Sequence, residues 1–343
     1  MRNIKVAILD TGIADELVDN RIKLRKQIYY DYYDEKIVYK DNATDYNGHG
    51  TVCVNTMWSV FDNIDVYAVN VMGISGRANI RTFAEGLSFA KTLDVDIISV
   101  CSSLIVEDED PQIKKICDEI TASGKVLVAA VQNGRKSSAI ANYPGVIGVL
   151  GANIEGYSYA FDRKKAVQMI CDNKNYIVEG RKLLCECFLG NSRATAIATG
   201  IIAKLLFDSF LCENDINNID IIDALEKNVN KDVCERVFNE QEKESILETS
   251  FDIAREKYLV ENEENYHKLI YLLCEYLECD NSEIVRKNRL WDINNNYLLT
   301  NIGPLFQILK DRLGISIKML KVDSLEYAYT LYDACYNSVG AKC

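Results

Sequence analysis

The segment from Gly190 to Gly200 places a serine, Ser192, where its hydroxyl could do chemistry. Small residues fill this segment and run into the apolar stretch 201–206, a pattern that predicts the start of a buried helix. A hydroxyl at a helix start lies near the positive end of the helix dipole, beside backbone N–H groups that could stabilise an oxyanion. The alternative role of Asn191 or Ser192 is to cap the first turn of that helix.

A second candidate is His49, one of only 2 histidines in the chain. It lies between Gly48 and Gly50 and precedes the segment 52–58, so the backbone can turn and present the imidazole at a helix start. A lone histidine is often structural. Its position between two glycines and before a helix favours the role of a general base.

A third candidate is Asp10, which follows the short apolar run 4–9. Such a run predicts a strand covered on both faces, and open parallel sheets carry functional groups at the carboxyl ends of their strands. The tripeptide Asp10-Thr11-Gly12 also occurs in aspartic proteases, in which two carboxylates share one proton. Because the chain has no second Asp-Thr-Gly or Asp-Ser-Gly, that chemistry would require a homodimer.

A fourth candidate is Asn133, which follows the strand-like run 126–131 and precedes Gly134. An amide at this edge of a sheet could donate a hydrogen bond to an oxyanion. A turn formed by the Asn-Gly pair is the alternative.

These candidates depend on an alternation of strands and helices. Apolar runs predict strands at 4–9, 64–71, 95–101, 125–131 and 146–151, and amphipathic segments predict helices at 82–93 and 111–123. The alternation predicts an α/β fold with a doubly wound parallel sheet and helices on both faces. The tyrosine-rich segment 26–40 predicts an exposed β-ribbon.

The four stretches, in this order, resemble the subtilisin-like serine proteases over about residues 1–208. The resemblance implies a triad of Asp10, His49 and Ser192, with Asn133 in the oxyanion hole. It also implies that a peptide substrate would pair with the strands near Val71, Gly73, Val100, Cys101, Ser102 and Ser103. Within this pattern Asn191 replaces the usual threonine and Ala196 the usual proline. Cys53 is similar to the thiol that one branch of the family has beneath the catalytic histidine.

Composition limits the other classes of function. The net charge of -12 argues against a nucleic-acid partner, and no apolar run reaches the length of a membrane-spanning helix. The N-terminus shows no signal-peptide pattern, so we expect a cytoplasmic protein whose 12 cysteines are reduced. Neither Cys171 with Cys185 and Cys187 nor His267 with Cys274 and Cys279 has the paired spacing of a metal site. We therefore expect no metal and no cofactor.

The C-terminal third differs in composition, because glycine nearly disappears and helical patterns take over. We expect an acidic helical extension at 209–262 and a small helical bundle at 263–343. The bundle weakly resembles an acyl- or peptidyl-carrier domain, but the loop 294–299 lacks the serine that carries phosphopantetheine. This resemblance implies a docking module for a partner, without a prosthetic group.

The sequence therefore favours an intracellular serine endopeptidase, and we expect it to cleave a dedicated peptide, such as the leader of a ribosomally made peptide. Two alternatives stay open. One is a catalytically silent module that binds peptides, and the other is a dimeric aspartic protease that uses Asp10.

Overall fold

The computed structural model describes residues 2–31, 33–73, 76, 78–102, 110–132, 138–154, 156–174, 176–180, 185–211, 221–229, 231–240, 263–277, 279, 284, 290, 302–315, 319–321, 328, 331 and 332. The chain separates into two compact units. The first comprises residues 1–174, 180–182 and 188–242, and the second comprises 175–179, 183–187 and 243–343.

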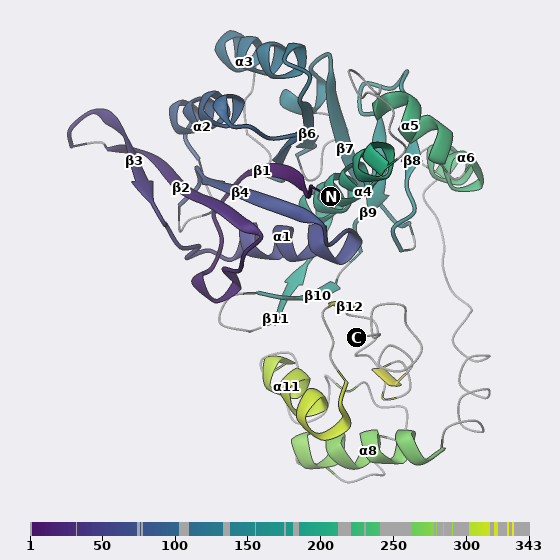
Figure 1. Ribbon diagram of the computed structural model, residues 1–343. Coiled ribbons are helices and arrows are strands. Elements are labelled where there is room, and N and C mark those ends of the chain that lie inside the picture. Colours follow the sequence, from purple (N-terminus) through teal and green to yellow (C-terminus); the bar gives the residue numbers. More distant parts are fainter. Residues whose placement is uncertain are drawn as a thin grey trace. The chain divides into compact units, whose positions relative to one another are not determined.

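A nine-stranded sheet forms the centre of the first unit, in the order β3-β2-β4-β1-β5-β6-β7-β9-β8 (Figure 1). Its strands are β1 (Ile4–Asp10), β2 (Ile22–Asp31), β3 (Lys36–Asp41), β4 (Ile64–Asn70), β5 (Ile97–Val100), β6 (Val126–Ala130), β7 (Val146–Ala152), β8 (Ala160–Phe161) and β9 (Met169–Asp172). The seven inner strands, β2-β4-β1-β5-β6-β7-β9 in sheet order, pair in parallel with their neighbours. The edge strands β3 and β8 pair antiparallel with β2 and β9. The fold is therefore the predicted α/β sheet with an antiparallel strand at each edge.

Helices cover both faces of this sheet (Figure 1). Helices α1 (His49–Val60) and α4 (Gly190–Leu211) pack against each other on one face. Helices α2 (Ile80–Thr92) and α3 (Pro111–Ala122) lie together on the other, where their apolar sides join the strands in a common core. The five strands and two helices predicted for this region are present, with ends that differ by at most two residues. The predicted β-ribbon is the hairpin of β2 and β3.

Two short helices extend the first unit beyond α4. Helix α5 (Ile221–Asn228) contacts α4, and the hydroxyl of Tyr159 donates a 2.9 Å hydrogen bond to the Leu225 carbonyl at its centre. Helix α6 (Lys231–Glu240) contacts β8. The described parts of the acidic segment after α4, helices α5 and α6, thus pack on the first unit.

The second unit has a core of its own. Helices α8 (Glu263–Leu277) and α11 (Ile302–Leu313) bury leucines such as Leu269, Leu273, Leu305 and Leu309 in one apolar cluster. The unit also holds a three-stranded sheet of β11 (Cys185–Phe188), β10 (Tyr176–Glu179) and β12 (Met319–Lys321), except for Phe188, which belongs to the first unit. We expected helices alone in the C-terminal region, and the structure adds strand β12 to them. Most of the expected bundle after α11 falls outside the described residues.

None of the helices in the described ranges combines the length and the apolar character that a bilayer crossing requires.

Candidate active site

The candidate site lies at the carboxyl edge of the parallel strands. Strand β1 ends at Asp10, whose register partner in β4 is Asn70, and β5 and β6 end at Val100 and Ala130. Parallel strands direct their carboxyl ends to the same edge of a sheet, so the loops that follow them gather there. Asp10 is 1% exposed, which removes its carboxylate from bulk water.

The turn after β1 forms the platform on which α1 begins. The backbone N–H of Thr11 donates a 2.8 Å hydrogen bond to Asp10 Oδ1, and the Thr11 hydroxyl accepts one of 2.8 Å from the N–H of Gly50. A Cβ atom at Gly50 would lie 2.4 Å from the carbonyl oxygen of Gly12. Only glycine permits this approach, so the glycine after His49 allows α1 to start directly against the aspartate turn.

Asp45 caps the start of α1 from the preceding loop. Its carboxylate accepts hydrogen bonds from the backbone N–H groups of Asn47, Gly48 and Thr51 at 2.9, 2.8 and 3.1 Å. The Thr51 hydroxyl donates a further bond of 2.7 Å. A negative charge at a helix N-terminus also interacts favourably with the helix dipole. This cap, together with the left-handed backbone of Gly48 at φ 107°, fixes where the helix begins and therefore where His49 points.

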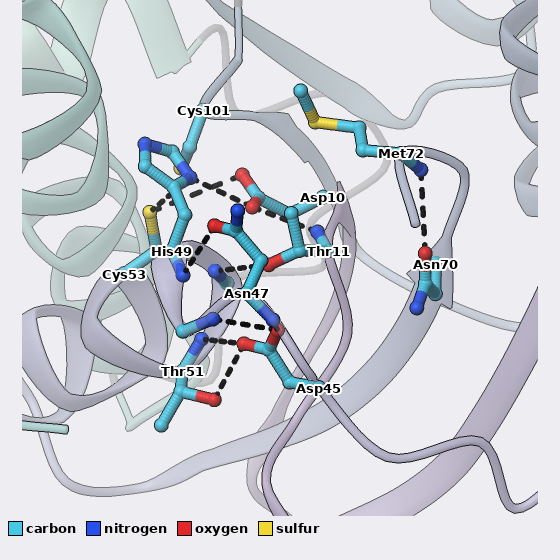
Figure 2. Close-up of polar contacts among 12 residues, drawn as sticks. Asp10, Thr11, Asp45, Asn47, His49, Thr51, Cys53, Asn70, Met72 and Cys101 are labelled. Atoms are coloured by element: carbon cyan, nitrogen blue, oxygen red, sulfur yellow. Dashed lines mark hydrogen bonds and ion pairs between the residues drawn. The ribbon is translucent and has the colours of Figure 1, made fainter. Parts of the chain in front are cut away.

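His49 and Asp10 form a direct pair. The distance between His49 Nδ1 and Asp10 Oδ1 is 2.7 Å, and Figure 2 shows the imidazole beside the carboxylate. Burial lowers the pKa of His49, but the charge of Asp10 and this hydrogen bond raise it more, to about 9. Such a pair holds the imidazole with Nδ1 toward the carboxylate and leaves Nε2 for another partner. The side chain of His49 is 30% exposed, and Nε2 is therefore accessible to a ligand.

Ser192 lies in the first turn of α4 and is partly exposed. Since α4 begins at Gly190, both Asn191 and Ser192 are inside the helix. Asn191 makes two hydrogen bonds with main-chain groups of the sheet: its Nδ2 donates to the Val131 carbonyl at 2.8 Å, and its Oδ1 accepts from the Gly151 N–H at 2.8 Å. These bonds anchor the serine turn to the ends of β6 and β7.

The serine turn and the histidine are connected by an aromatic contact. The ring of Phe188, at the end of β11, meets the His49 ring edge-on with centroids 5.7 Å apart. Phe188 is 4% exposed and lies four residues before Ser192. Helices α1 and α4 also approach closely, because a Cβ at Gly200 would lie 2.7 Å from Val60 Cβ. Among the described hydrogen bonds none joins Ser192 to His49, a bond that often forms only when a substrate is bound.

A buried ion pair lies directly beside the serine. Arg193 is fully buried, and its Nη1 lies 3.1 Å from Asp172 Oδ2 and donates a 3.0 Å hydrogen bond to the Asp172 carbonyl. Asp172, the last residue of β9, is also fully buried. The pair links the first turn of α4 to the end of β9, in addition to the ends of β6 and β7.

The predicted substrate-groove residues fall into three groups. Ser103, like Asn133, lies outside the described residues. The side chains of four others are buried, namely Val71, Val100, Cys101 and Ser102. Gly73 has a positive φ of 61° and open space where a Cβ would be. A peptide at this edge would therefore meet main chain rather than these side chains.

The sequence interpretation did not single out several residues that hold the site. Asp45 lies four residues before His49 and outside the N-cap position, which Gly48 occupies, so no local pattern indicates its role. The local pattern at Asn191 predicts a helix cap or a replacement for threonine, and no local pattern indicates a role for Arg193. Their partners, Val131, Gly151 and Asp172, are distant in the sequence, and no local pattern connects them.

Comparisons with known proteins match the part of the chain that carries these residues. A family model described as the Subtilase family matches residues 1–212. Subtilisin DY of Bacillus licheniformis is 28% identical over 182 residues, which are 50% of this chain and 58% of that protein. Alkaline elastase YaB of Bacillus sp. is 31% identical, over 38% of this chain and 34% of its own length. The Major intracellular serine protease of Bacillus subtilis is 29% identical, over 60% of this chain and 68% of its own length. The match thus spans less than two thirds of the first two relatives.

Proposed function

We propose that this chain, which belongs to the Subtilase family, is a serine endopeptidase that uses Asp10, His49 and Ser192 as a catalytic triad. The observation that carries the proposal is the 2.7 Å contact of His49 Nδ1 with the buried carboxylate of Asp10, at the sheet edge toward which the serine turn is anchored. The family match over residues 1–212 includes all three side chains.

In this mechanism His49 Nε2 accepts the Ser192 proton while the hydroxyl attacks a peptide carbonyl. Asp10 keeps the imidazole in the required tautomer and stabilises the imidazolium that forms. The proton then passes to the leaving amine, and a water molecule releases the acyl group by the same route. Asn133 and the Ser192 N–H are the proposed donors to the tetrahedral oxyanion, where one such donor contributes about 10²–10³-fold in turnover.

The burial of Asp10 favours this mechanism over an aspartic protease. A dimeric aspartic site would need Asp10 to face a second copy of itself, yet this carboxylate is 1% exposed and bonded to His49. The third possibility, a module that binds peptides without cleaving them, would keep the groove but has no use for an imidazole held by a buried acid.

Peptide cleavage by the purified full chain separates the three functions. We expect a mixture of unrelated peptides to yield internal fragments by mass spectrometry, and we expect no fragments from the Ser192→Ala variant. Cleavage that survives in Ser192→Ala but stops with pepstatin would establish the aspartic mechanism. Peptides that bind to the folded protein and stay intact would establish the silent module.

We propose further that the enzyme acts inside the cell on a dedicated peptide. The name of the Bacillus subtilis relative supports the location, and the second unit, with its own apolar core beyond the matched region, supports a restricted substrate. A separate docking unit is of little use for bulk protein digestion. We expect peptides encoded beside its gene to be cut at one position, and casein to be cut far more slowly. Faster digestion of casein would contradict the narrower role.

A further inference from the structure

A cavity of about 410 Å³ lies beside the predicted substrate groove. We call it the hairpin pocket, and it is bounded by Tyr29 and Tyr30 of β2, by Met72 and Gly73 after β4, and by Asn79 and Thr82 at the start of α2. Its volume falls within the range of about 300–1,000 Å³ that is typical of ligand sites. Because β2 lies on the side of β4 away from β5, the pocket is outside the groove between the segments that follow β4 and β5.

The register of the sheet places the hairpin pocket near the proposed triad. Gln27, which also lines the pocket, pairs with Asn70 of β4, and Asn70 pairs with Asp10 of β1. Two strand spacings of about 4.8 Å put Gln27 about 10 Å from Asp10. An extended peptide advances about 3.3 Å per residue. A substrate residue within about three positions of the scissile bond is therefore close enough to reach the pocket.

The wall between the pocket and the groove is held by hydrogen bonds and is low at one point. The Val71 N–H donates a 3.0 Å hydrogen bond to the Asp10 carbonyl. Asn70 Oδ1 accepts hydrogen bonds from the N–H groups of Met72 and Gly73 at 3.2 and 3.1 Å, and Figure 2 shows the first of these bonds. A Cβ at Gly73 would have no described atom within 4 Å. A substrate side chain can therefore pass over the main chain of Gly73.

The lining of the pocket is uncharged and partly aromatic. Its described residues include apolar ones such as Ile28 and Met72 and the tyrosines Tyr29 and Tyr30, and none of them carries a charge. The guanidinium carbon of Arg81 lies 5.4 Å from the centre of the Tyr30 ring, a contact that holds this ring in place. Thioether sulfur and aromatic rings interact favourably with a further aromatic ring. The lining therefore favours an uncharged aromatic side chain over a charged one.

One hydroxyl of the lining lacks a partner. Thr82 is 3% exposed, and within the described part of the chain its Oγ1 has no hydrogen-bond partner. The Thr82 N–H donates a 2.8 Å hydrogen bond to Asn79 Oδ1, which caps α2 and fixes the Thr82 backbone. Threonine in a helix divides between two χ1 rotamers, so this hydroxyl can turn toward a ligand. A buried hydroxyl without a partner is destabilising, and a polar group on the ligand would remove that penalty.

We propose that the hairpin pocket recognises a tyrosine side chain of the substrate, with the phenol hydroxyl bonded to Thr82 Oγ1 and the ring beside Met72 and the tyrosines of β2. The proposal rests on the proposed peptidase function and names the substrate class of that site. A peptide in the groove meets mostly main chain, with which peptides of any sequence can pair. Selection of one peptide therefore requires a side-chain pocket.

The test is the cleavage of internally quenched peptides by the purified full chain. The peptides consist of alanine, glycine and serine with one tyrosine at each position in turn, and mass spectrometry locates the cut. We expect cuts at a constant distance from the tyrosine, within about three residues of it. We expect kcat/KM to be at least about 10-fold higher than for the same peptide with alanine instead. Phenylalanine should give an intermediate value, and glutamate should be no better than alanine.

Variants of the pocket sharpen the test. Thr82→Val removes the hydroxyl and keeps the shape of the side chain, so the ratio of kcat/KM for tyrosine over phenylalanine should fall by about 5-fold. Tyr29→Ala opens the wall, and the preference for tyrosine over alanine should fall by at least about 5-fold. Tyr33→Ala is the matched control, because Tyr33 lies in the turn of the same hairpin and is 95% exposed. It should cleave all the peptides as the unmodified chain does.

An unchanged ratio in Thr82→Val would overturn the hydroxyl contact. Tyrosine and alanine peptides that are cleaved at equal rates would overturn the pocket, as would equal losses of preference in Tyr29→Ala and Tyr33→Ala. Circular dichroism checks that each variant is folded, and Tyr29→Leu replaces Tyr29→Ala if that variant is not.

A binding measurement decides the pocket even if the chain cleaves no peptide. Fluorescence anisotropy with dye-labelled tyrosine and alanine peptides on the Ser192→Ala variant should show at least about 10-fold tighter binding of the tyrosine peptide. The difference should shrink when Tyr29→Ala is added. This preference in a chain that never cleaves would support the pocket and contradict the peptidase function. Equal binding of the two peptides, or no binding of either by the folded protein, would overturn the pocket.

Discussion

The two halves of the candidate site are held in different ways. In the acid–base half, bonds within each segment hold Thr11 to Asp10 and Asp45 to the first turn of α1, and one bond, from the Gly50 N–H to the Thr11 hydroxyl, joins the two segments. The serine half is tied by long-range bonds, from Asn191 to the ends of β6 and β7 and from Arg193 to Asp172. The ring contact of Phe188 with His49 joins the halves.

This difference indicates how the site is assembled. The pair of Asp10 and His49 is complete in the free protein, whereas the described hydrogen bonds include none from Ser192 to His49. Catalytic hydrogen bonds are often long in free enzymes and tighten on substrate binding. The acid–base half is therefore preorganised by its own hydrogen bonds.

The largest effect is expected from removing the proposed nucleophile or the proposed base. Ser192→Ala and His49→Ala should each lower kcat by about 10⁶-fold, because neither attack nor proton transfer can proceed without its partner. The double variant should be no worse than either single one, since the two side chains act as a unit. Steady-state kinetics with a cleavable peptide measures this, and additive losses would mean that they act independently.

A smaller loss is expected within the acid–base half. Asp10→Asn should lower kcat by about 10⁴-fold, because the amide favours the wrong imidazole tautomer while the geometry is kept. It should also lower the pKa of His49, since the charge of Asp10 is what raises it. Nuclear magnetic resonance of the imidazole would show both changes, and an unchanged pKa would contradict the pairing.

On the serine side we expect a loss of stability from Asp172→Asn. Removing one partner of a buried ion pair leaves Arg193 charged in the interior, which costs about 3–5 kcal/mol in the free energy of unfolding. Urea denaturation measures this cost. Asp172→Leu combined with Arg193→Met should lose less than Asp172→Asn, because no unpaired charge remains, and an equal or larger loss would show that the pair is not the cause.

The anchor of the serine turn is tested by Asn191→Ala. The substitution leaves the Val131 carbonyl and the Gly151 N–H without a side-chain partner, at about 1–3 kcal/mol each. We expect reduced stability and a fall in kcat that exceeds any rise in KM. The matched variant Asp45→Ala should destabilise the other half by a similar amount, and kinetics with unfolding data for both would show which half limits the rate.

The smallest effect concerns pH. Because the folded protein raises the pKa of His49 from 6.5 to about 9, the pair with Asp10 contributes its full stability below pH about 6.5 and loses it as the pH rises through about 9. From pH 6 to pH 10, the free energy of unfolding should fall by at least about 1 kcal/mol more in the unmodified chain than in His49→Gln. An equal fall in both would contradict the raised pKa.

The difference between the acid–base half and the serine half explains which features could be predicted from the sequence. Asp10-Thr11-Gly12 and the segment 47–51 carry their own turn chemistry, so the strand end, the helix start and the position of His49 could be predicted locally. The strands and helices of the sheet followed from apolar periodicity. Asn191 and Arg193 could not be assigned roles, because their partners are set by the order of β6, β7 and β9 in the sheet.

Covalent labelling with a fluorophosphonate, located by mass spectrometry, tests the triad most directly. The reagent reacts with a serine hydroxyl only where a neighbouring base and an oxyanion site activate it. We predict one adduct, on Ser192, that is absent in Ser192→Ala and His49→Ala and strongly slowed in Asp10→Asn. Folded protein that takes up no label, or label on Ser192 that persists in His49→Ala, would contradict the account.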